Sequence, residues 1–368
     1  DLANVTVCEG SAYAISQATF PTYFLKQLDK ASENQIELDL QIFARYLAPA
    51  LGATVRFVGT EPFDPLTRRY NEMMTELLPK SGIEVVQIER KELEEKPISA
   101  SRTRAFIENN KLHAAMQLVP PTTQPYIMAK FAVDALQQEL DTTPKPGLVD
   151  KDNSGAHTDM DYILMERSIK SLRPYFVRLA QLGLSADKLT TADVQRIGIE
   201  AEAAMLRTTH GVNTHRGALF ALGITVAAAM WLYAHEGQEV RKERLQQMIQ
   251  EIAAGFPPSA DTHGAEVVAK ARVKGARENA VEGYPDLFET WGPYYRKLRE
   301  DPHRAHRTLL KIMSMLQDTN IYYRTDAETA EIVRQSSGQL LQRFSVNSLR
   351  EADAATTSRR VAVPTCSR

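Results

Sequence analysis

The sequence is poor in cysteine and has almost no excess of either charge. Its 368 residues include two cysteines, Cys8 and Cys366, near opposite ends of the chain. This spacing excludes a disulfide framework and a thiolate metal site, and it fits a reducing cytoplasm. The 44 basic and 46 acidic residues leave a net charge of −2, so no general attraction to nucleic acid or an anionic membrane is expected. Any phosphate binding must therefore be local.

Export and membrane signals are also scarce. Residues 1–10 have neither the basic start nor the apolar stretch of a signal peptide, so a cytoplasmic protein is expected. One apolar run, 217–234, is about as long as the shortest spanning helix. A helix buried on all sides in a soluble helical domain has the same composition, and this interpretation is favoured because the run is rich in Ala and Gly.

The chain changes character near residue 120. Before it, β-rich runs at 54–59 and 83–88 alternate with a helical stretch at 38–51, which predicts an α/β domain with a parallel sheet over 1–120. The segment VPPTT at 119–123 interrupts both helix and strand. After it, apolar residues recur three and four apart, which predicts a nearly all-α domain over 121–345. Helices are expected at 127–140, 159–182, 192–207, 241–254 and 304–316.

The connection at 143–161 is the richest in reactive side chains. It offers Lys145, His157 and several carboxylates, together with glycines where a backbone can approach a ligand closely. Carboxylate oxygens suit Mg²⁺, and an ammonium can act as a point charge on a triphosphate. The segment therefore predicts a joint site for Mg²⁺ and phosphate. The alternative for Asp159 is a structural one, as the cap of the following helix.

A second segment, HGVNTHRG at 210–217, immediately precedes the apolar run. The free N–H groups and positive dipole end of a helix N-terminus favour phosphate, and Asn213 and Arg216 can add donors. Alternatively, Asn213 or Thr214 caps the helix and His215 is a surface residue. Similar mixtures occur at 262–264, 277–278 and 318–320. No pair has a zinc-motif spacing, which favours metal binding through carboxylates. Aromatic residues such as Trp231, Tyr294 and Tyr295 are more typical of packing than of an adenine platform.

Five ordered segments carry a family resemblance: PKPGLVDKDNSGAHTDMD, GVNTHRGALFALG, DTHG, KGARENAVEGYP and QDTN. Together they resemble the triphosphoribosyl-dephospho-coenzyme A synthases that serve citrate lyase and malonate decarboxylase maturation, over about 123–345. The resemblance implies that ATP and 3′-dephospho-coenzyme A give 2′-(5″-triphosphoribosyl)-3′-dephospho-coenzyme A and free adenine. It also implies inversion at the anomeric carbon, hence a single displacement.

This resemblance suggests roles for the reactive residues. Displacement at an anomeric carbon passes through an oxocarbenium-like state and needs a base on the nucleophile and an acid near the leaving group. As a hypothesis, Asp150 or Asp159 activates the hydroxyl or stabilises the sugar cation, and His157 or His215 assists adenine departure. Asp161 and Asp318 would hold Mg²⁺. The expected ATP and phosphate contacts are Lys145, Asn153, Gly155, Asn213, Gly217, His263, Gly264, Arg277 and Asn320.

Residues 1–120 resemble a different protein, the second half of citrate lyase ligase, which acetylates the thiol of the finished prosthetic group using ATP and acetate. The likeness is carried by EGSAYAISQATFPTYFLK, FVGTEPFDPLTRRYN and PISASRTR. It implies a nucleotidyltransferase-like α/β fragment in which Ser99, Ser101 and Arg102, at a helix start, contact ATP phosphates. The family's His-x-Gly-His motif would lie upstream of residue 1, so this fragment is expected to be unable to make acetyl-adenylate and to be vestigial.

The last 23 residues, 346–368, depart from the synthase pattern. Synthases of this kind end with a segment like SPGGSADML, whereas this chain ends RRVAVPTCSR. Codons for those residues, read two bases later, can encode PGGSADMF, so a slip of the reading frame after about Phe344 is a hypothesis. The sequence thus leaves three readings: the synthase, which is favoured, the ligase, and an inactive truncated fusion. The expected partners are ATP, dephospho-coenzyme A and, downstream, citrate lyase maturation proteins and the acyl carrier subunit.

Overall fold

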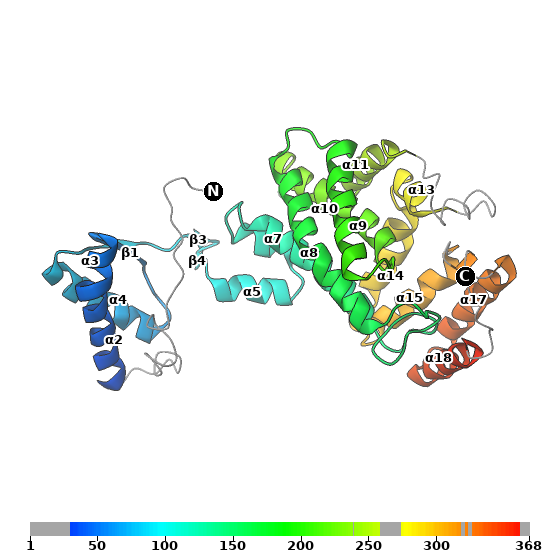
Figure 1. Cartoon of the computed structure of the whole chain (residues 1–368), viewed down its shortest axis with the longest axis horizontal. Coiled ribbons are helices and arrows are strands. Elements are labelled where there is room, and N and C mark those ends of the chain that lie inside the picture. The colour runs from blue at the N-terminus through cyan, green and yellow to red at the C-terminus, as the bar shows by residue number, and fades with distance from the viewer. Residues whose placement is uncertain (1–29, 238, 258–273, 318–320, 323–325, 361–368) are drawn as a thin grey trace. The chain divides into compact units, whose positions relative to one another are not determined.

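The computed structural model describes residues 30–237, 239–257, 274–317, 321–322 and 326–360 (Figure 1). Contacts divide the chain into two compact units, Asp1–Arg102 and Thr103–Arg368. The sequence boundary near residue 120 remains a prediction, since α5 (Ala100–Glu108) and α6 (Leu112–Gln117) lie between the two positions.

The first unit contains a two-stranded parallel sheet. Strand β1 (Val55–Gly59) pairs with β2 (Glu84–Ile88) in the register Val55↔Glu84 to Gly59↔Ile88, which confirms the expected strands. Between them run α4 (Pro65–Leu77) and the short 3₁₀ turn η2 (Leu78–Ser81), because parallel strands need a crossover connection. The remaining elements are α2 (Lys30–Ile42), the π-helical turn η1 (Phe43–Leu47), α3 (Ala48–Leu51), β3 (Glu92–Leu93) and β4 (Lys96–Pro97).

A small core holds this unit together. Ile36 and Leu40 on α2 are buried with Leu66 and Met74 on α4. Burial of each such side chain contributes about 1.5–3 kcal/mol. The helix expected at 38–51 is therefore part of a longer run, which begins in the described chain at Lys30 and passes through a π-helical turn.

Every regular element among the described residues of the second unit is a helix, as the apolar spacing predicted. Asp161 caps α8, Thr190 caps α9 and Asp326 caps α17, in each case by accepting from a backbone N–H of the first turn. Its longer helices are α7 (Gln124–Asp141), α8 (Tyr162–Ser185), α9 (Thr191–Thr208), α10 (Arg216–His235), α11 (Lys242–Ala254), α15 (Arg304–Met315), α17 (Ala327–Gln342) and α18 (Val346–Arg360). Shorter ones are α13 (Ala276–Val281), η3 (Leu287–Trp291) and α14 (Gly292–Lys297).

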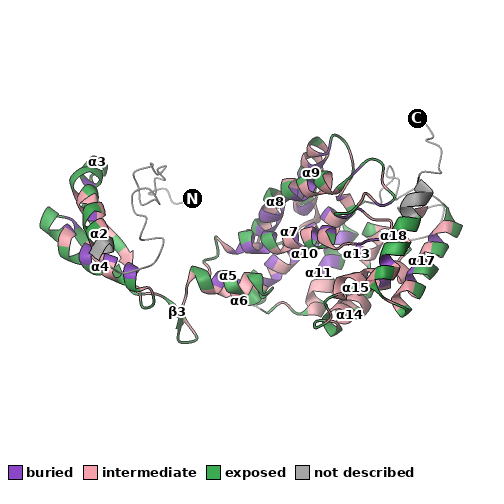
Figure 2. Ribbon diagram, turned by 90° about the horizontal axis from the view of Figure 1, so that it is seen from below, coloured by how far each residue is buried: buried purple, intermediate pink, exposed green. Residues whose placement is uncertain are grey.

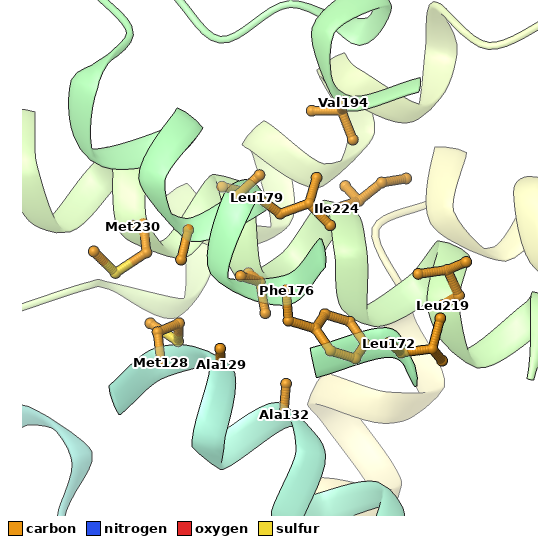
Figure 3. Packing of buried hydrophobic residues seen from close by; sticks show 14 of the residues in the cluster. Met128, Ala129, Ala132, Leu172, Phe176, Leu179, Val194, Leu219, Ile224 and Met230 are labelled. Atoms are coloured by element: carbon orange, nitrogen blue, oxygen red, sulfur yellow. The ribbon is translucent and has the colours of Figure 1, made fainter. Parts of the chain in front are cut away.

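Helix α10 forms the centre of this unit. It packs against α7, α8, α9 and α11, and Figure 2 marks buried residues on its ribbon among intermediate ones. Figure 3 shows Leu172, Phe176 and Leu179 of α8 meeting residues of α7 and α10 in one apolar cluster. A side chain at Gly183 would lie 2.4 Å from the carbonyl oxygen of Ala227, so α8 and α10 approach closely there. Within the described ranges, α10 alone is long and apolar enough to cross a membrane, and half of that stretch is buried.

Candidate functional site

The connection between α7 and α8, the 142–161 loop, is organised around the buried carboxylate of Asp150. Its Oδ2 accepts from the backbone N–H of Lys145 at 2.7 Å. Its Oδ1 accepts from the backbone N–H groups of Asp152 at 2.8 Å and Asn153 at 3.1 Å. The side chain is 1% exposed. Both oxygens of this candidate base are thus engaged in holding the loop in shape.

Lys145 is buried to the same extent, 1% exposed. Its Nζ donates to the Glu139 carbonyl oxygen at 2.8 Å and to Glu139 Oε1 at 2.6 Å. An ammonium buried in this way needs such a partner, because an uncompensated buried charge is very costly. The residue expected to contact a triphosphate is therefore held by Glu139, which lies in the last turn of α7 and was not among the residues selected from the sequence.

Gly155 is required by the loop's own backbone. Its φ is +55°, and a Cβ there would lie 2.5 Å from Gly147 C and from Leu148 N and O. The two sides of the loop are joined where Ala156 N–H donates to the Gly147 carbonyl at 3.0 Å. The expectation was that a ligand approaches this glycine, and the close approach in the structure is made by the chain itself.

Asn153 connects the loop to α18. Its Oδ1 accepts from Gly155 N–H at 2.7 Å, and its Nδ2 donates to Asp353 Oδ2 at 2.6 Å. Asp353 is 7% exposed, and burial, together with the nearby charges of Asp150 and Asp152, raises its pKa. Asp353 belongs to the segment 346–368, which departs from the synthase pattern in sequence. The reading-frame hypothesis stays a prediction.

His157, Asp159 and Asp161 lie where the loop enters α8. His157 Nδ1 is 3.6 Å from Asp159 Oδ1, and the two side chains are 19% and 46% exposed. Asp161 Oδ1 accepts from Leu164 N–H at 2.8 Å. The helix cap is thus Asp161, and not Asp159 as the structural alternative proposed. Within the described ranges, no three His, Cys, Asp or Glu residues converge as a metal site.

His215, at the start of α10, is 5% exposed, so the alternative of a surface histidine is wrong. Its Nδ1 is hydrogen-bonded to Ser168 Oγ at 2.8 Å, and Thr214 Oγ1 donates to the same Ser168 Oγ at 2.7 Å. Nε2 is buried and has no hydrogen-bond partner among the described residues. Burial and then the charge of Lys145 lower the His215 pKa to about 4, so the ring is neutral at physiological pH.

The other expected contacts near α10 and α13 are less enclosed. Asn213 Oδ1 accepts from Arg216 N–H at 3.2 Å, and Arg216 pairs with Glu202. Gly217 is exposed and has open space where a side chain would project. Arg277 Nε donates to the Phe256 carbonyl at 2.8 Å. Four further candidates lie outside the described residues: His263, Gly264, Asp318 and Asn320.

His306, on α15, is a neighbour of this loop that the sequence did not single out. Burial lowers its pKa, while the backbone of Thr143 and the charge of Asp150 oppose that shift. The Lys145 charge therefore acts on two rings, that of His215 just before α10 and that of His306 in α15, and the Asp150 charge acts on His306. The only sequence signal was a pair of histidines three residues apart, His303 and His306, around the start of a helix.

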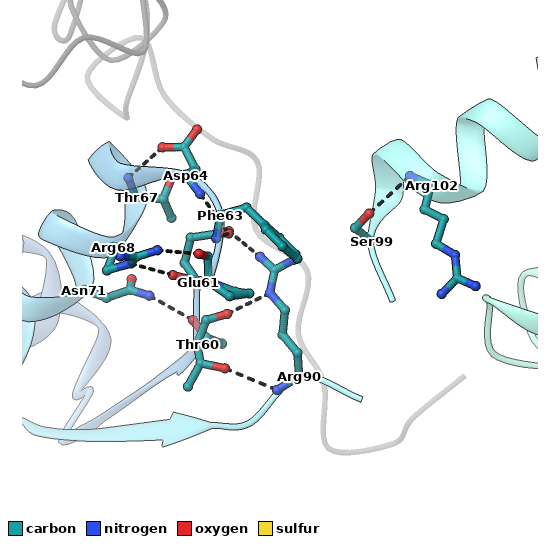
Figure 4. Close-up of polar contacts among 12 residues, drawn as sticks. Thr60, Glu61, Phe63, Asp64, Thr67, Arg68, Asn71, Arg90, Ser99 and Arg102 are labelled. Atoms are coloured by element: carbon teal, nitrogen blue, oxygen red, sulfur yellow. Dashed lines mark hydrogen bonds and ion pairs between the residues drawn. The ribbon is translucent and has the colours of Figure 1, made fainter. Parts of the chain in front are cut away.

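In the first unit, Ser99 and Arg102 form a local helix start (Figure 4). Ser99 Oγ accepts from Arg102 N–H at 3.1 Å, and Arg102 Nη1 donates to the carbonyls of Leu93 and Lys96, both at 3.2 Å. The expected helix start is confirmed, since α5 begins at Ala100 and Ser101 lies exposed in its first turn. Contact with ATP phosphates remains a prediction.

The turn after β1 is tightly hydrogen-bonded (Figure 4). Asn71 Nδ2 donates to the Gly59 carbonyl at 2.8 Å, and Arg90 Nε donates to the Thr60 carbonyl at 2.7 Å. Glu61 accepts from two backbone N–H groups of the turn and pairs with Arg90. These contacts hold the loop between β1 and α4 from α4 and from the segment that follows β2.

Comparisons with known proteins agree with this division. A family model described as ATP:dephospho-CoA triphosphoribosyl transferase matches residues 126–363. The chain belongs to this family. A second model, the citrate lyase ligase C-terminal domain, matches residues 1–127. Both resemblances noted in the sequence are thereby confirmed. No solved structure matches the chain.

Curated relatives match each part separately. Probable 2-(5″-triphosphoribosyl)-3′-dephosphocoenzyme-A synthases are 37% identical over 240 residues in Pseudomonas fluorescens Pf-5 and 37% over 227 in Azotobacter vinelandii. These alignments cover 62% and 59% of this chain and 81% and 77% of the relatives. The [citrate [pro-3S]-lyase] ligase of Escherichia coli is 48% identical over 132 residues, 34% of this chain and 38% of the ligase. The chain thus spans well under half of that ligase.

Proposed function

We propose that the helical unit transfers the triphosphoribosyl group of ATP to the 2′-hydroxyl of 3′-dephospho-coenzyme A and releases adenine. The main support for this proposal is the family match over residues 126–363, a range that includes the 142–161 loop and the start of α10. The Lys145 charge that acts on His215 supports placing these two segments at one site. The protein is accordingly a transferase that uses ATP as a substrate.

In this reaction the hydroxyl oxygen attacks C1′ of the ATP ribose as the bond from C1′ to adenine N9 breaks. The hydroxyl proton passes to a base, and adenine leaves with a proton supplied by an acid. We choose Asp159 as the base because its side chain is 46% exposed and can be reached by a substrate. Both carboxylate oxygens of Asp150, by contrast, accept hydrogen bonds from loop N–H groups. His157, 3.6 Å from Asp159, is close enough to hold that carboxylate in position, whereas in an inverting displacement the acid for adenine acts from the opposite face of the sugar. The neutral, enclosed His215 would instead shape the ATP side of the site.

Mg²⁺ is part of the proposal. It prefers one or two protein carboxylates together with substrate phosphates, and we keep Asp161 and Asp318 as the residues that would hold it. Asp161 uses Oδ1 for its helix cap, so its second oxygen would face the cation. Bound there, Mg²⁺ would neutralise charge on the triphosphate. The phosphate contacts expected from Asn153, Asn213, Gly217 and Arg277 are retained, whereas Lys145 would act through its charge unless Glu139 released it.

The test is chromatographic detection of free adenine after mixing the full chain with ATP, Mg²⁺ and dephospho-coenzyme A, with coenzyme A as the control acceptor. Adenine that appears only with the dephospho form supports the synthase. Its absence from folded protein refutes this function and favours the inactive fusion. Asp159→Asn should lower the rate by about 10²–10⁴-fold, the usual contribution of a positioned base. Asp134→Asn, an exposed carboxylate paired with Lys130, is the matched control and should leave the rate unchanged.

Ligase activity of the first unit is a second candidate. It rests on the match over 1–127 and on 48% identity to the Escherichia coli ligase. In this proposal the unit is a nucleotidyltransferase-like fragment in which Ser99, Ser101 and Arg102 contact ATP. Acetate-dependent formation of pyrophosphate and AMP would support it, and their absence under conditions that release adenine would exclude it. Either activity would serve the citrate lyase acyl carrier subunit and other maturation proteins in the cytoplasm.

A further inference from the structure

Two of the residues expected to contact phosphate hold carboxylates of the chain itself. Lys145 Nζ donates to Glu139 Oε1 at 2.6 Å, and Asn153 Nδ2 donates to Asp353 Oδ2 at 2.6 Å. Both donors belong to the segment PKPGLVDKDNSGAHTDMD, whereas Glu139 and Asp353 lie outside all five ordered segments. Carboxylate and phosphate oxygens accept the same charge-assisted hydrogen bonds. Each of these two donors is thus paired with a group that resembles a substrate phosphate.

The two carboxylates differ in how they can leave the loop. The side chain of Glu139 is 51% exposed, so its rotation into solvent frees the Lys145 ammonium. Asp353 is 7% exposed and lies on α18. An enclosed side chain has little room to rotate, because protein interiors are closely packed. The Asp353 carboxylate therefore leaves Asn153 only when the helix that carries it moves.

Helix α18 is attached to the helical unit through a narrow face. Among the side chains described for this helix, residues 346–355, the buried ones are Leu349 and Asp353, one helical turn apart. The others are intermediate or exposed. A helix held by few buried side chains belongs to the least stable part of a fold and can open while the rest stays folded. Movement of α18 is therefore compatible with an intact core.

The charges around Asp353 also favour its release. Burial raises the pKa of Asp353, and the charges of Asp150 and Asp152 add to this effect, while the hydrogen bond from Asn153 opposes it. Asn153 thus holds a carboxylate that its other neighbours repel. A triphosphate arrives together with Mg²⁺, whose charge compensates this repulsion, whereas the Asp353 carboxylate has no such cation.

We propose that α18 is an autoinhibitory element, in which Asp353 holds a phosphate position at Asn153 until ATP displaces it. This inference rests on the proposed transferase function. In the chain without substrate, α18 covers the Asn153 amide. When ATP binds, α18 moves away and Asn153 Nδ2 donates to a phosphate oxygen in place of Asp353 Oδ2. The apparent affinity of the loop for phosphate is lowered in proportion to the fraction of molecules in which α18 is bound.

The test measures binding of inorganic tripolyphosphate with Mg²⁺ to the full chain by isothermal titration calorimetry. Asp353→Asn removes the charge and keeps the size of the side chain. Leu349→Ala weakens the apolar attachment of α18 and leaves Asn153 and Asp353 unchanged. Both variants should bind tripolyphosphate about 10-fold more tightly than the parent, because α18 is released more easily. Glu351→Gln, at an exposed carboxylate of the same helix, is the matched control and should bind like the parent.

Hydrogen exchange followed by mass spectrometry reports on the helix directly. In the parent, saturating tripolyphosphate with Mg²⁺ should speed the exchange of amides in 346–360 and slow that of amides in the 142–161 loop. Slower or unchanged exchange in 346–360 would overturn the proposal, because the helix would then close over the ligand or ignore it. Equal or weaker binding by Asp353→Asn and Leu349→Ala would overturn it as well. So would a lack of binding by every chain, since Asp353 would then hold no phosphate position.

Failure of this inference can be told apart from failure of the proposed function, because tripolyphosphate binding requires no catalysis. Tighter binding by the two variants, without adenine release from any chain, refutes the transferase function alone. Adenine release with the same KM for ATP in the parent, Asp353→Asn and Leu349→Ala refutes the autoinhibition alone.

Discussion

Gly155→Ala tests whether the 142–161 loop depends on the close approach of its two sides. Gly155 and Gly211 both have positive φ, +55° and +88°. An alanine Cβ at Gly155 would lie 2.5 Å from backbone atoms of Gly147 and Leu148, whereas at Gly211 nothing lies within 4 Å. The conformational penalty, about 1–2 kcal/mol, is therefore shared by the two variants, and the steric penalty belongs to Gly155→Ala alone.

The steric part is an overpacking cost of about 1–3 kcal/mol, because the atoms that must give way are backbone. For a unit of this size we expect Gly155→Ala to melt about 2–10 °C below Gly211→Ala. Fluorescence-monitored unfolding measures this in the helical unit specifically, since Trp231 and Trp291 both lie there. Adenine release should fall in Gly155→Ala, because a shifted loop displaces Asn153 and Asp159. Equal melting temperatures for the two variants would show that the loop is not tightly closed at Gly155.

Three further outcomes are expected. Asn153→Asp should lower the free energy of unfolding by about 1–3 kcal/mol, because it places a carboxylate against Asp353 Oδ2, which lies 2.6 Å from Asn153 Nδ2 in the native pair. Adding Asp353→Asn should restore most of this free energy. A double-mutant cycle by urea unfolding measures the coupling between the two positions. The pKa of His215 is about 4 in the folded chain, against an ordinary value of 6.5. Between these two pH values only the unfolded state binds a proton at His215. The contribution of His215 to folding stability is therefore complete above about pH 6.5 and is lost as the pH falls toward 4. By pH 5 the loss of unfolding free energy due to His215 amounts to about 2 kcal/mol. The midpoints of urea unfolding should show this loss in the parent and in the control variant His235→Gln, at an exposed site, but not in His215→Gln. Asp161→Ala should cost about 1 kcal/mol of stability through the lost α8 cap, while Asp159→Ala should lower adenine release with little effect on stability.

Local sequence determined much of the architecture. The β-branched runs at 54–59 and 83–88 form the paired strands β1 and β2, because their composition and separation favour strand, crossover and strand. Apolar residues three and four apart produced the helical unit, and the all-round apolar run at 217–234 became α10, buried by its neighbours. These features depend on periodicity, which the sequence displays directly.

The reactive segments were also recognisable from residue types, but the partners of their side chains were not. Nothing in the local sequence shows that Glu139 pairs with the Lys145 ammonium or that both carboxylate oxygens of Asp150 accept hydrogen bonds from loop N–H groups. Asp353 meets Asn153 across 200 residues of chain, and no local pattern encodes such a contact. His306 is brought to the loop by the packing of α15, so the sequence could show only that a histidine was present.

The turn at Tyr284 illustrates the same limit most clearly. Sequence patterns favoured packing for aromatic residues such as Trp231, Tyr294 and Tyr295, and they singled out neither Tyr284 nor Trp291. Only the tertiary structure shows that Tyr284 has a left-handed backbone, with φ +50°, and that its hydroxyl and the Trp291 Nε1–H are buried without a hydrogen-bond partner among the described residues. The sequence by itself determined the helices, the strands and the family, because these follow from local periodicity and ordered motifs. Tertiary packing decided which polar side chains are hydrogen-bonded within the fold and which can contact a ligand. The physical reason is that burial and hydrogen-bond partners come from residues distant in the chain.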